Sequence, residues 1–422
     1  MYQRIGAAAL KKDLTNTLAL CKQLQNPERA FKSIHIAGTN GKGSVAHVLS
    51  SFLQEAGCKV GLYTSPHYQG FRERIRINGK KISEIEVCQF VEEHYSSFEE
   101  IKPSFFEITV AMAFDHFRNH QVDFAVVETG LGGRLDSTNV LNPELSIITN
   151  ISFDHMAMLG DDLVSIAVEK AGIIKNEIPV IIGKRQEATD HVFLQKAKEE
   201  GAEIYWAEDI GRLSEKQMNI SGTSTQWQYE ETELEIETPF HTEYQIENLR
   251  TALAAYFLLD GKKIVPSKTD FEKALKQLQN RGYMGRFQTI GKEPLVIVDA
   301  AHNETGISQL VTHINGTNFQ QLRIVLGAVN DKSLDGILSK LPSTARYFFC
   351  RPNIPRGLAE SELAELAKGF GLNGTTYDSV KSAFVSSKET ANEKDLVLVT
   401  GSTFVVAEVL QFAQVTFPKL QD

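Results

Sequence analysis

The chain is poor in cysteine and lacks the short spacings with which cysteines bind metals. Its 422 residues include four cysteines, at positions 21, 58, 88 and 350, without a C-x-x-C pair. This scatter argues against a disulfide framework and against a zinc site. It is typical of proteins that fold in a reducing cytosol.

Long apolar runs are also missing. The N-terminal sequence MYQRIGAAALKKDL has no apolar signal core. No other run approaches the roughly 20 apolar residues of a membrane-spanning helix. We therefore expect a cytoplasmic protein that is neither exported nor bound to a membrane.

Runs of basic residues are absent as well, and the formal net charge is −9. Affinity for nucleic acids depends largely on the neutralisation of phosphates, so we expect no nucleic-acid partner. An acidic chain can still bind small anions in local pockets of backbone N–H groups and a few cations. We expect small-molecule partners and a monomer.

The chain does contain enough apolar material for two domains. Hydrophobic residues make up 42% of its 422 residues, and a domain usually has about 100–200 residues. Short β-branched or aromatic runs alternate with amphipathic stretches, which predicts an α/β domain with a mainly parallel sheet. The predicted strands are 33–36, 59–63, 124–128, 145–150 and 179–182, with helices at 45–56, 84–93 and 105–119.

The pattern changes after residue 183 and restarts near residue 295. Residues 204–238 contain alternating Glu-Leu-Glu-Ile-Glu, which predicts short antiparallel strands, and a helix is expected at 247–259. Residues 281–286 include two glycines and are the expected hinge. Strands at 295–299, 323–327, 347–350 and 395–400 predict a smaller Rossmann-like α/β domain. We place the domains at residues 1–285 and 286–422 and expect a cleft that closes on its substrates.

A glycine-rich segment joins the first predicted strand to the first predicted helix. We call it the glycine loop, and it consists of Gly38, Thr39, Asn40, Gly41, Lys42, Gly43 and Ser44. Glycine permits positive φ and lets a ligand approach the N–H groups of a helix N-terminus. Lys42 supplies a charge for phosphates, and the Ser44 hydroxyl can reach a phosphate-bound Mg²⁺. The alternative is a plain glycine turn, but the position between strand and helix favours a nucleotide phosphate loop.

The glycine loop is two residues shorter than the standard G-x-x-x-x-G-K-[ST] loop and resembles that of the Mur ligase superfamily. Further motifs follow in order and resemble folylpolyglutamate synthase and dihydrofolate synthase. They are residues 62–67, 71–79, 128–136, 154–155, 169–175 and 299–303. In the last motif Ala300 replaces the usual glycine. The resemblance spans nearly the whole chain and implies ATP- and Mg²⁺-dependent ligation of L-glutamate to a folate through an acyl phosphate.

Candidate magnesium ligands are indicated by the predicted strands and by the family resemblance. Glu128 ends a predicted parallel strand, where α/β folds often place a metal-binding carboxylate, although a loop or cap role is the alternative. The resemblance implies that Ser65 and His155 complete the site; alone, they would be a turn residue and a structural histidine. It also implies two Mg²⁺ ions and a carbamylated Lys170. From composition, Lys170 would instead extend its ammonium to water or pair with Glu169.

The resemblance assigns the rest of the nucleotide and glutamate sites. Asn248, Arg286 and Asp299 are expected to contact ATP, with a hinge salt bridge as the alternative for Arg286. His302 and Ser402 are expected to hold the incoming glutamate, although Thr-Gly-Ser also makes an ordinary helix cap. The implied catalytic residues are Lys42, Lys170 and His302.

Two segments of the first domain have two interpretations each. Arg72, Arg74 and Arg76 would share one face of an extended segment. They form either a solvated edge strand or, by resemblance, a folate-side loop in which Arg74 contacts the substrate. Ser104 and Glu107 have the spacing of a capping box, whereas the resemblance places Glu107 near the pterin site.

Two other functions remain as alternatives. Cell-wall Mur ligases carry a UDP-binding domain before the phosphate loop, for which a loop beginning at Gly38 leaves no room. A nucleotide-binding regulatory module would need neither a second domain with Asp299 and His302 nor a set of metal ligands. The sequence leaves open whether the chain acts on folate, on dihydropteroate, or on both.

Overall fold

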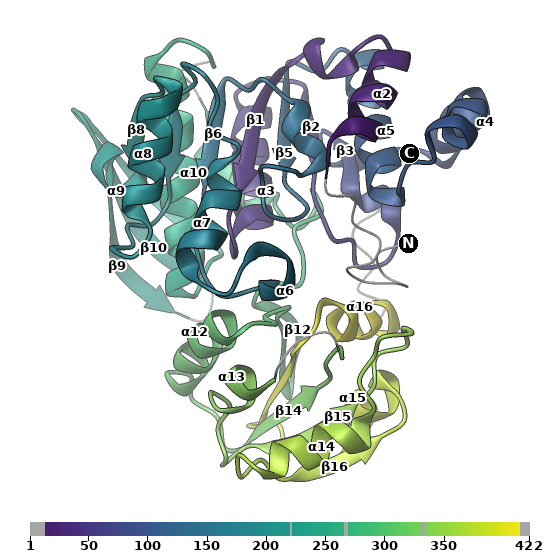
Figure 1. The fold of residues 1–422 in the computed structure, drawn as a ribbon. Helices are drawn as coiled ribbons and strands as arrows, with labels where there is room; N and C mark the ends of the chain where they lie inside the picture. The colour runs from purple at the N-terminus through teal and green to yellow at the C-terminus, as the bar shows by residue number, and fades with distance from the viewer. Residues whose placement is uncertain (1–12, 220–221, 266–268, 331–333, 414–422) are drawn as a thin grey trace. The chain divides into compact units, whose positions relative to one another are not determined.

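The computed structural model describes residues 13–219, 222–265, 269–330 and 334–413, and their contacts define two compact units. The larger unit ends at Tyr283, and the smaller one begins at Met284. Each unit is built around a sheet of its own (Figure 1). Within these described ranges, every helix is too short or too polar to cross a membrane.

The larger unit contains an eight-stranded sheet with the order β4-β3-β2-β5-β1-β6-β7-β8. Its strands are β1 (Lys32–Ala37), β2 (Val60–Tyr63), β3 (Ile75–Ile77), β4 (Lys80–Lys81), β5 (Phe124–Glu128), β6 (Leu145–Ile148), β7 (Val180–Ile182) and β8 (Ile204–Trp206). The strands from β2 to β8 in this order are parallel, and β3 and β4 are antiparallel additions at one edge. The predicted mainly parallel α/β sheet is therefore confirmed.

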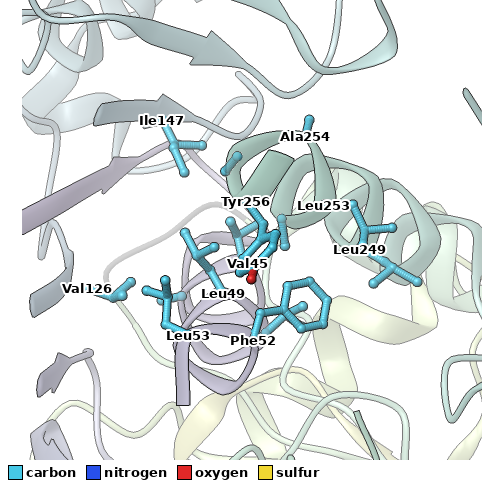
Figure 2. Packing of buried hydrophobic residues seen from close by; sticks show 14 of the residues in the cluster. Val45, Leu49, Phe52, Leu53, Val126, Ile147, Leu249, Leu253, Ala254 and Tyr256 are labelled. Atoms are coloured by element: carbon cyan, nitrogen blue, oxygen red, sulfur yellow. The ribbon is translucent and has the colours of Figure 1, made fainter. Parts of the chain in front are cut away.

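Helices cover both faces of this sheet, and its central strands are therefore buried on both sides. Ile34 and Ile36 of β1 face a core shared with α3 (Lys42–Glu55), α10 (Glu243–Gly261) and α11 (Phe271–Lys276). Figure 2 shows Leu49 and Phe52 of α3 beside Tyr256 of α10 within this core. The other helices are α2 (Thr15–Gln23), α4 (Glu84–Ile101), α5 (Phe105–Asn119), α6 (Met156–Leu159), α7 (Leu163–Ala171), α8 (Asp190–Glu200) and α9 (Ala207–Ile210).

The segment predicted as short antiparallel strands has two parts. Its beginning, β8, instead extends the main sheet and pairs in parallel with β7. The antiparallel sheet consists of β9 (Arg212–Asn219), β10 (Gly222–Tyr229) and β11 (Thr232–Thr238). Trp227 of β10 is fully buried against the core of the larger unit, so this small sheet is fixed to the unit by apolar packing.

The smaller unit has a six-stranded sheet with the order β12-β13-β17-β14-β15-β16. Its strands are β12 (Gln288–Lys292), β13 (Leu295–Val298), β14 (Leu322–Leu326), β15 (Arg346–Cys350), β16 (Gly374–Tyr377) and β17 (Leu396–Thr400). Its helices are α12 (Glu304–Asn315), α13 (Asp335–Leu338), α14 (Glu360–Lys368), α15 (Val380–Glu389) and α16 (Thr403–Phe412). Only β12 is antiparallel to its neighbour. The predicted strands are present, and β12 and β16 were not predicted.

Candidate active site

The glycine loop lies at the carboxyl end of β1, where the order in which successive strands are added to the main sheet reverses. After β1 the chain crosses to β2, on the side of β5, and it later returns to the other side of β1 as β6. Such a switch point opens a crevice at the carboxyl ends of parallel strands. Glu128, the last residue of β5, pairs in register with Ile36 of β1. The sheet therefore places the Glu128 carboxylate beside the start of the loop.

Two glycines of the loop have conformations and surroundings that exclude a side chain. Gly38 has φ +140°, and a Cβ there would lie 1.9 Å from Oγ1 of Thr149. Gly41 has φ +86°, and a Cβ there would lie 2.1 Å from Oδ1 of Asn248. Both values lie in the left-handed region that favours glycine. Asn248 of α10, an expected ATP contact, is thus seated directly against the N-cap of α3.

The loop is held by the segment that follows β6. The Thr39 N–H donates to the Asn150 carbonyl at 2.8 Å, and the Thr39 hydroxyl donates to the Ser152 carbonyl at 3.1 Å. The Asn40 N–H donates to Oδ1 of Asn150, whose amide donates back to the Asn40 carbonyl. The Thr149 hydroxyl also donates a hydrogen bond to the Asn40 carbonyl at 2.6 Å. Their supporting role was not predicted: Thr149 and Asn150 were placed inside the predicted strand 145–150, but β6 ends at Ile148 and leaves both in the segment after it.

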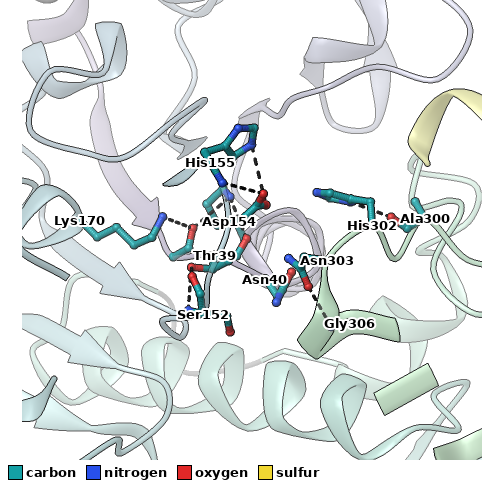
Figure 3. A network of polar contacts seen from close by, with 12 residues as sticks. Thr39, Asn40, Ser152, Asp154, His155, Lys170, Ala300, His302, Asn303 and Gly306 are labelled. Carbon is teal, nitrogen blue, oxygen red and sulfur yellow. Dashed lines mark hydrogen bonds and ion pairs between the residues drawn. The ribbon is translucent and has the colours of Figure 1, made fainter. Parts of the chain in front are cut away.

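Two lysines converge on the carbonyl of Gly38. Lys42 Nζ donates to the carbonyls of Gly38 and Thr39 at 3.1 and 3.2 Å. Lys170 Nζ, from α7, donates to the same Gly38 carbonyl at 2.8 Å (Figure 3). Lys170 is buried, so the expectation from composition that it extends into water is wrong. Burial, together with the positive charge of Lys42, lowers the pKa of Lys170 to about 7.

The three predicted metal ligands have different neighbours. Oε2 of Glu128 accepts the Ser65 N–H at 3.0 Å, which joins the ends of β5 and β2. The same oxygen would lie 3.3 Å from a Cβ at Gly43, so the carboxylate borders the loop directly. His155 starts α6 with φ +52°, and its Nε2 lies 3.8 Å from Oδ2 of Asp154 (Figure 3). Ser44 of the loop is buried, with its hydroxyl 3.4 Å from the Tyr283 hydroxyl.

A buried aspartate organises the segment after Glu128. Asp136 accepts the Thr138 N–H at 3.0 Å, the Thr138 hydroxyl at 2.5 Å and the Leu131 N–H at 2.8 Å. Asn139 continues this support by donating to the carbonyls of Arg134 and Gly172. Asp136 was part of a motif that was recognised in the sequence, but its supporting role required the fold.

Asp299, His302 and Ser402, predicted site residues of the smaller unit, follow the carboxyl ends of β13 and β17, which are adjacent strands. Asp299 is buried and accepts the N–H groups of Phe287 and Ala301 at 2.7 and 2.8 Å. The His302 ring contacts the Ala300 carbonyl through Nδ1 at 2.9 Å (Figure 3). Ala300 is itself buried, so its extra methyl group is accommodated where the resembling motif has glycine.

Ser402 and Arg286 occupy the ends of elements in this unit. Ser402 is the N-cap of α16, and its hydroxyl accepts the Phe404 N–H at 3.2 Å. The alternative role of Ser402 as an ordinary helix cap is therefore present in the structure. Arg286 lies just before β12, next to Phe287, whose N–H is fixed by Asp299.

Known protein families match both units. Residues 36–256 match the Mur ligase middle domain, and residues 285–403 match the Mur ligase, glutamate ligase domain. A dihydrofolate synthase/folylpolyglutamate synthase of Bacillus subtilis is 33% identical over 412 residues, which cover 95% of this chain and 94% of the relative. The chain belongs to the folylpolyglutamate synthase/dihydrofolate synthase family of Mur ligases. It spans 47% of the length of a Haloferax volcanii relative that is 32% identical over 406 residues.

Solved structures of Mur ligases of this family have the same fold. A Mycobacterium tuberculosis folylpolyglutamate synthase complexed with ADP and AMPPCP superimposes with a TM-score of 0.87 at 31% identity, covering 96% of each chain. A bifunctional folylpolyglutamate synthase/dihydrofolate synthase from Yersinia pestis, complexed with AMPPNP and Mn ion, gives a TM-score of 0.84 at 28% identity. That match covers 97% of this chain and 95% of the Yersinia chain.

The three arginines of this Mur ligase do not share one face. The shared face required an extended segment, but Phe71–Arg74 is a 3₁₀ helix and only Ile75–Ile77 is a strand. Arg72 donates to the Ile82 carbonyl and pairs with Glu84 at 2.8 Å. Arg76 is buried and donates to the Gly79 carbonyl.

Arg74, the predicted substrate contact, is buried and held by two neighbouring side chains. Its Nε donates to Nδ1 of His67 at 3.0 Å, and its guanidinium lies 5.9 Å from the centre of the Phe105 ring. Burial and the positive charge of Arg74 lower the pKa of His67 to about 4, which keeps this imidazole a neutral acceptor at pH 7. The contacts with His67 and Phe105 fix the direction of the Arg74 side chain.

The capping-box interpretation of Glu107 is realised in the ligase. Ser104 accepts the Glu107 N–H at 3.2 Å, and Glu107 Oε2 accepts the Ser104 N–H at 2.5 Å. Glu107 Oε2 also accepts from the Asn16 amide at 3.3 Å. Glu107 thus has a structural function at the start of α5.

The Ser104 cap gives a stability prediction. Replacing Ser104 by alanine leaves the Glu107 N–H without its side-chain acceptor and should lower the free energy of unfolding by about 1 kcal/mol. Urea unfolding followed by circular dichroism measures the loss. Ser104→Thr, which retains the hydroxyl, is the matched control and should lose less. Equal unfolding midpoints for the alanine variant and the wild type would contradict the prediction.

The loop conformation gives a prediction for Gly41. Alanine at this position adopts the left-handed region at a cost of about 1–2 kcal/mol, and its Cβ collides with Asn248. We expect Gly41→Ala to weaken ADP binding by roughly tenfold, measured by titration calorimetry. Gly57→Ala is the control, because Gly57 has φ +92° with no atom within 4 Å of a Cβ. ADP binding that is equal in both variants would count against a nucleotide role for the loop.

Proposed function

We propose that the chain is an ATP-dependent ligase that joins L-glutamate to the carboxylate of a folate. The observation that carries this proposal is the glycine loop, which contains Lys42 and has Glu128 beside it, in a chain that matches both Mur ligase domains. Relatives with activities named for this reaction are similar over nearly the whole chain. The substrates are ATP, L-glutamate and a folate.

The residues that we propose to bind the phosphates of the nucleotide lie in the larger unit. We propose that the N–H groups of the glycine loop and the N-terminus of α3 hold the phosphates. Lys42 exchanges its bonds to the Gly38 and Thr39 carbonyls for phosphate oxygens. Asn248, packed against Gly41, contacts the nucleotide from α10. We also propose Arg286 and Asp299 of the smaller unit as ATP contacts.

The residues around the loop fit a magnesium ion. The buried Glu128 carboxylate borders Gly43 and is linked to Ser65, and oxygen ligands of this kind suit Mg²⁺. We propose Ser65, Glu128 and His155 as its protein ligands. When bound, the ion neutralises charge on the phosphates. We further propose a second ion and a carbamylated Lys170, whose carbamate would add oxygen ligands near the loop.

The burial of Lys170 supports the carbamate. An amine with a pKa of about 7 is largely uncharged above neutral pH, and an uncharged amine reacts with CO₂. The step forms an N–C bond, converts the amine and CO₂ to a carbamate anion, and releases one proton to solvent. The product is an anion next to Lys42, whose positive charge then favours it.

The reaction proceeds in two steps on this arrangement. The folate carboxylate oxygen attacks the γ-phosphorus of ATP, and the bond from this phosphorus to the β,γ-bridging oxygen breaks. ADP departs, and the folate carries an acyl phosphate. The α-amine of glutamate then attacks the acyl carbon, forming the amide and releasing phosphate and a proton. The loop N–H groups and Lys42 stabilise the charge that develops on the transferred group. His302 and Ser402 orient the glutamate, and Arg74 meets the acidic part of the folate.

A glutamate-dependent ADP-release assay tests the proposal. We expect ADP release with tetrahydrofolate and glutamate together, and little release when either is omitted. A cell-wall type of Mur ligase, or a nucleotide-binding module without ligase chemistry, would show no stimulation by folate. Product mass should increase by one glutamate residue for each turnover.

A second activity, the conversion of dihydropteroate to dihydrofolate, is supported by the relatives whose names contain both synthases. The same assay with dihydropteroate in place of tetrahydrofolate tests it. Stimulation by both substrates identifies a bifunctional enzyme, whereas stimulation by tetrahydrofolate alone limits the chain to glutamate addition.

A further inference from the structure

Two histidines and a glutamate meet near the amino end of β5, away from the glycine loop at the carboxyl ends of the strands. His116 and His120 are one turn apart at the end of α5, and Glu86 is in the first turn of α4. The helix α5 leads into the start of β5, whereas Glu128 at the end of β5 borders the glycine loop. The whole length of β5 therefore separates this group, which we call the His–Glu cluster, from the proposed active site.

The ligand atoms of the cluster converge on one point. Oε1 of Glu86 lies 2.7 Å from Nε2 of His120 and 3.3 Å from Nδ1 of His116. One ligand atom from each residue lies within 4.8 Å of the other two. In a tetrahedral zinc site, bonds of about 2.0–2.1 Å place ligand atoms roughly 3.4 Å apart. The spacing needs only a small opening at His120, whose side chain is 42% exposed and has room to turn.

The surroundings orient the carboxylate for a shared ligand. Oε2 of Glu86 is occupied by the N–H and the hydroxyl of Ser83, at 2.9 and 2.6 Å, in the capping box of α4. This support leaves Oε1 directed at the two imidazoles. Outer partners of this kind commonly fix metal-binding carboxylates.

The protonation state of the buried histidine is compatible with this geometry. Burial lowers the pKa of His116 to about 4, and the Glu86 carboxylate opposes this shift only in part. His116 is therefore uncharged at pH 7, which is the form that binds metals. Lys59 places a positive charge near His116 and is the group that weakens cation binding here.

We propose that Glu86, His116 and His120 form a binding site for a divalent transition-metal ion of the zinc type. Two imidazoles and one carboxylate, with water at the fourth position, form a common ligand set for zinc. The cysteine spacing argued against a zinc site, and this set uses no cysteine. Glu86 lies 30 residues before His116 and 34 before His120, so only the fold brings its carboxylate to the two histidines.

The site would join the start of α4 to the end of α5, in addition to the apolar packing of α4 against the core. Phe90 is the buried residue of the 18-residue helix α4. The start of α4 is tied to the segment before Arg74 through the pair of Arg72 and Glu84. A metal ion between α4 and α5 would therefore also hold the end of that segment in place.

Zinc titration of the full-length protein in excess Mg²⁺, against a chromophoric chelator, tests this inference without any ligase assay. The wild type should bind about one equivalent of Zn²⁺ per chain at the cluster. Glu86→Gln retains the capping box, because glutamine also caps at this position. Glu86→Gln and His120→Gln should each weaken binding by at least about tenfold. His191→Gln, at an exposed histidine of α8, should bind as the wild type does.

A second readout separates metal binding from folding. Zn²⁺ should raise the melting temperature of the wild type and of His191→Gln, but not of Glu86→Gln or His120→Gln. Glu128→Gln, which alters the proposed magnesium site, should keep the zinc response. If the wild type and all variants bind equal amounts of Zn²⁺ with unchanged melting temperatures, the cluster is a hydrogen-bonded group only and the inference is overturned.

Discussion

Replacing Lys42 by alanine should reduce the turnover number for glutamate-dependent ADP release by about 10²–10³-fold, which is the usual loss when one charge-stabilising donor is removed. Lys42 Nζ already lies 3.1 Å from the Gly38 carbonyl, inside the loop that is proposed to hold the phosphates. Without it, the transferred phosphoryl group keeps the loop N–H groups but loses the neighbouring positive charge. The Michaelis constant for folate should change much less than the turnover number.

A matched lysine separates this effect from a general loss of charge. Lys276 lies on α11, pairs with Glu272 at 3.3 Å and is 66% exposed. Lys276→Ala should retain normal turnover, and circular dichroism should show both variants folded. Near-normal ADP release by Lys42→Ala would contradict the assignment of Lys42 to phosphate binding.

Replacing Lys170 should reduce turnover by about 10²-fold or more, because the change would remove both the contact with Gly38 and the proposed carbamate. Arginine at position 170 keeps a positive charge but cannot form this carbamate. If the carbamate is required, Lys170→Arg should be as inactive as Lys170→Ala. Intact-protein mass spectrometry under mild conditions, and tandem spectra of the peptide, should find a mass increase of one CO₂ on Lys170 of the wild type.

The pH dependence of the carbamate follows from the lowered pKa. Because Lys170 has a pKa of about 7, it is protonated below neutral pH and uncharged above it. The CO₂ adduct and the activity should decline after incubation near pH 6 without bicarbonate and return near pH 8 with bicarbonate. Lys175 is half-buried and donates to the Asn139 carbonyl; Lys175→Met should keep the bicarbonate response. An unmodified Lys170 in fully active enzyme would refute the carbamate.

The order of elements in the larger unit could be predicted because its strands are short, apolar and separated by clear helical periodicity. The helix Phe105–Asn119 has the predicted bounds, since Ser104 and Glu107 mark its start chemically. The pattern did not show that β8 joins the main sheet, because a three-residue strand shortly after helix α8 carries no pairing information. The short β16 is exposed over most of its length and lacked an apolar signal.

The candidate site was predictable where one motif contains both ends of a contact. The glycine loop contains Lys42 and the Gly38 carbonyl that it binds. The supports from Thr149 and Asn150 could not be predicted, because they depend on the neighbouring position of β6 and β1 in the sheet. Arg74 was expected on an extended face, but the 3₁₀ helix turns its side chain toward His67. Short-range geometry of this kind does not follow from alternation alone.

The bonds that hold Thr39 and Asn40 to the segment after β6 have a thermodynamic consequence. A flexible loop must be ordered when its ligand binds, and the lost conformational freedom reduces affinity. Here that ordering is completed when the sheet forms, because both residues are already bonded to Asn150 and Ser152. The loop is preorganised, so nucleotide binding carries little entropic penalty from its backbone and depends mainly on the exchange of the two carbonyl bonds of Lys42.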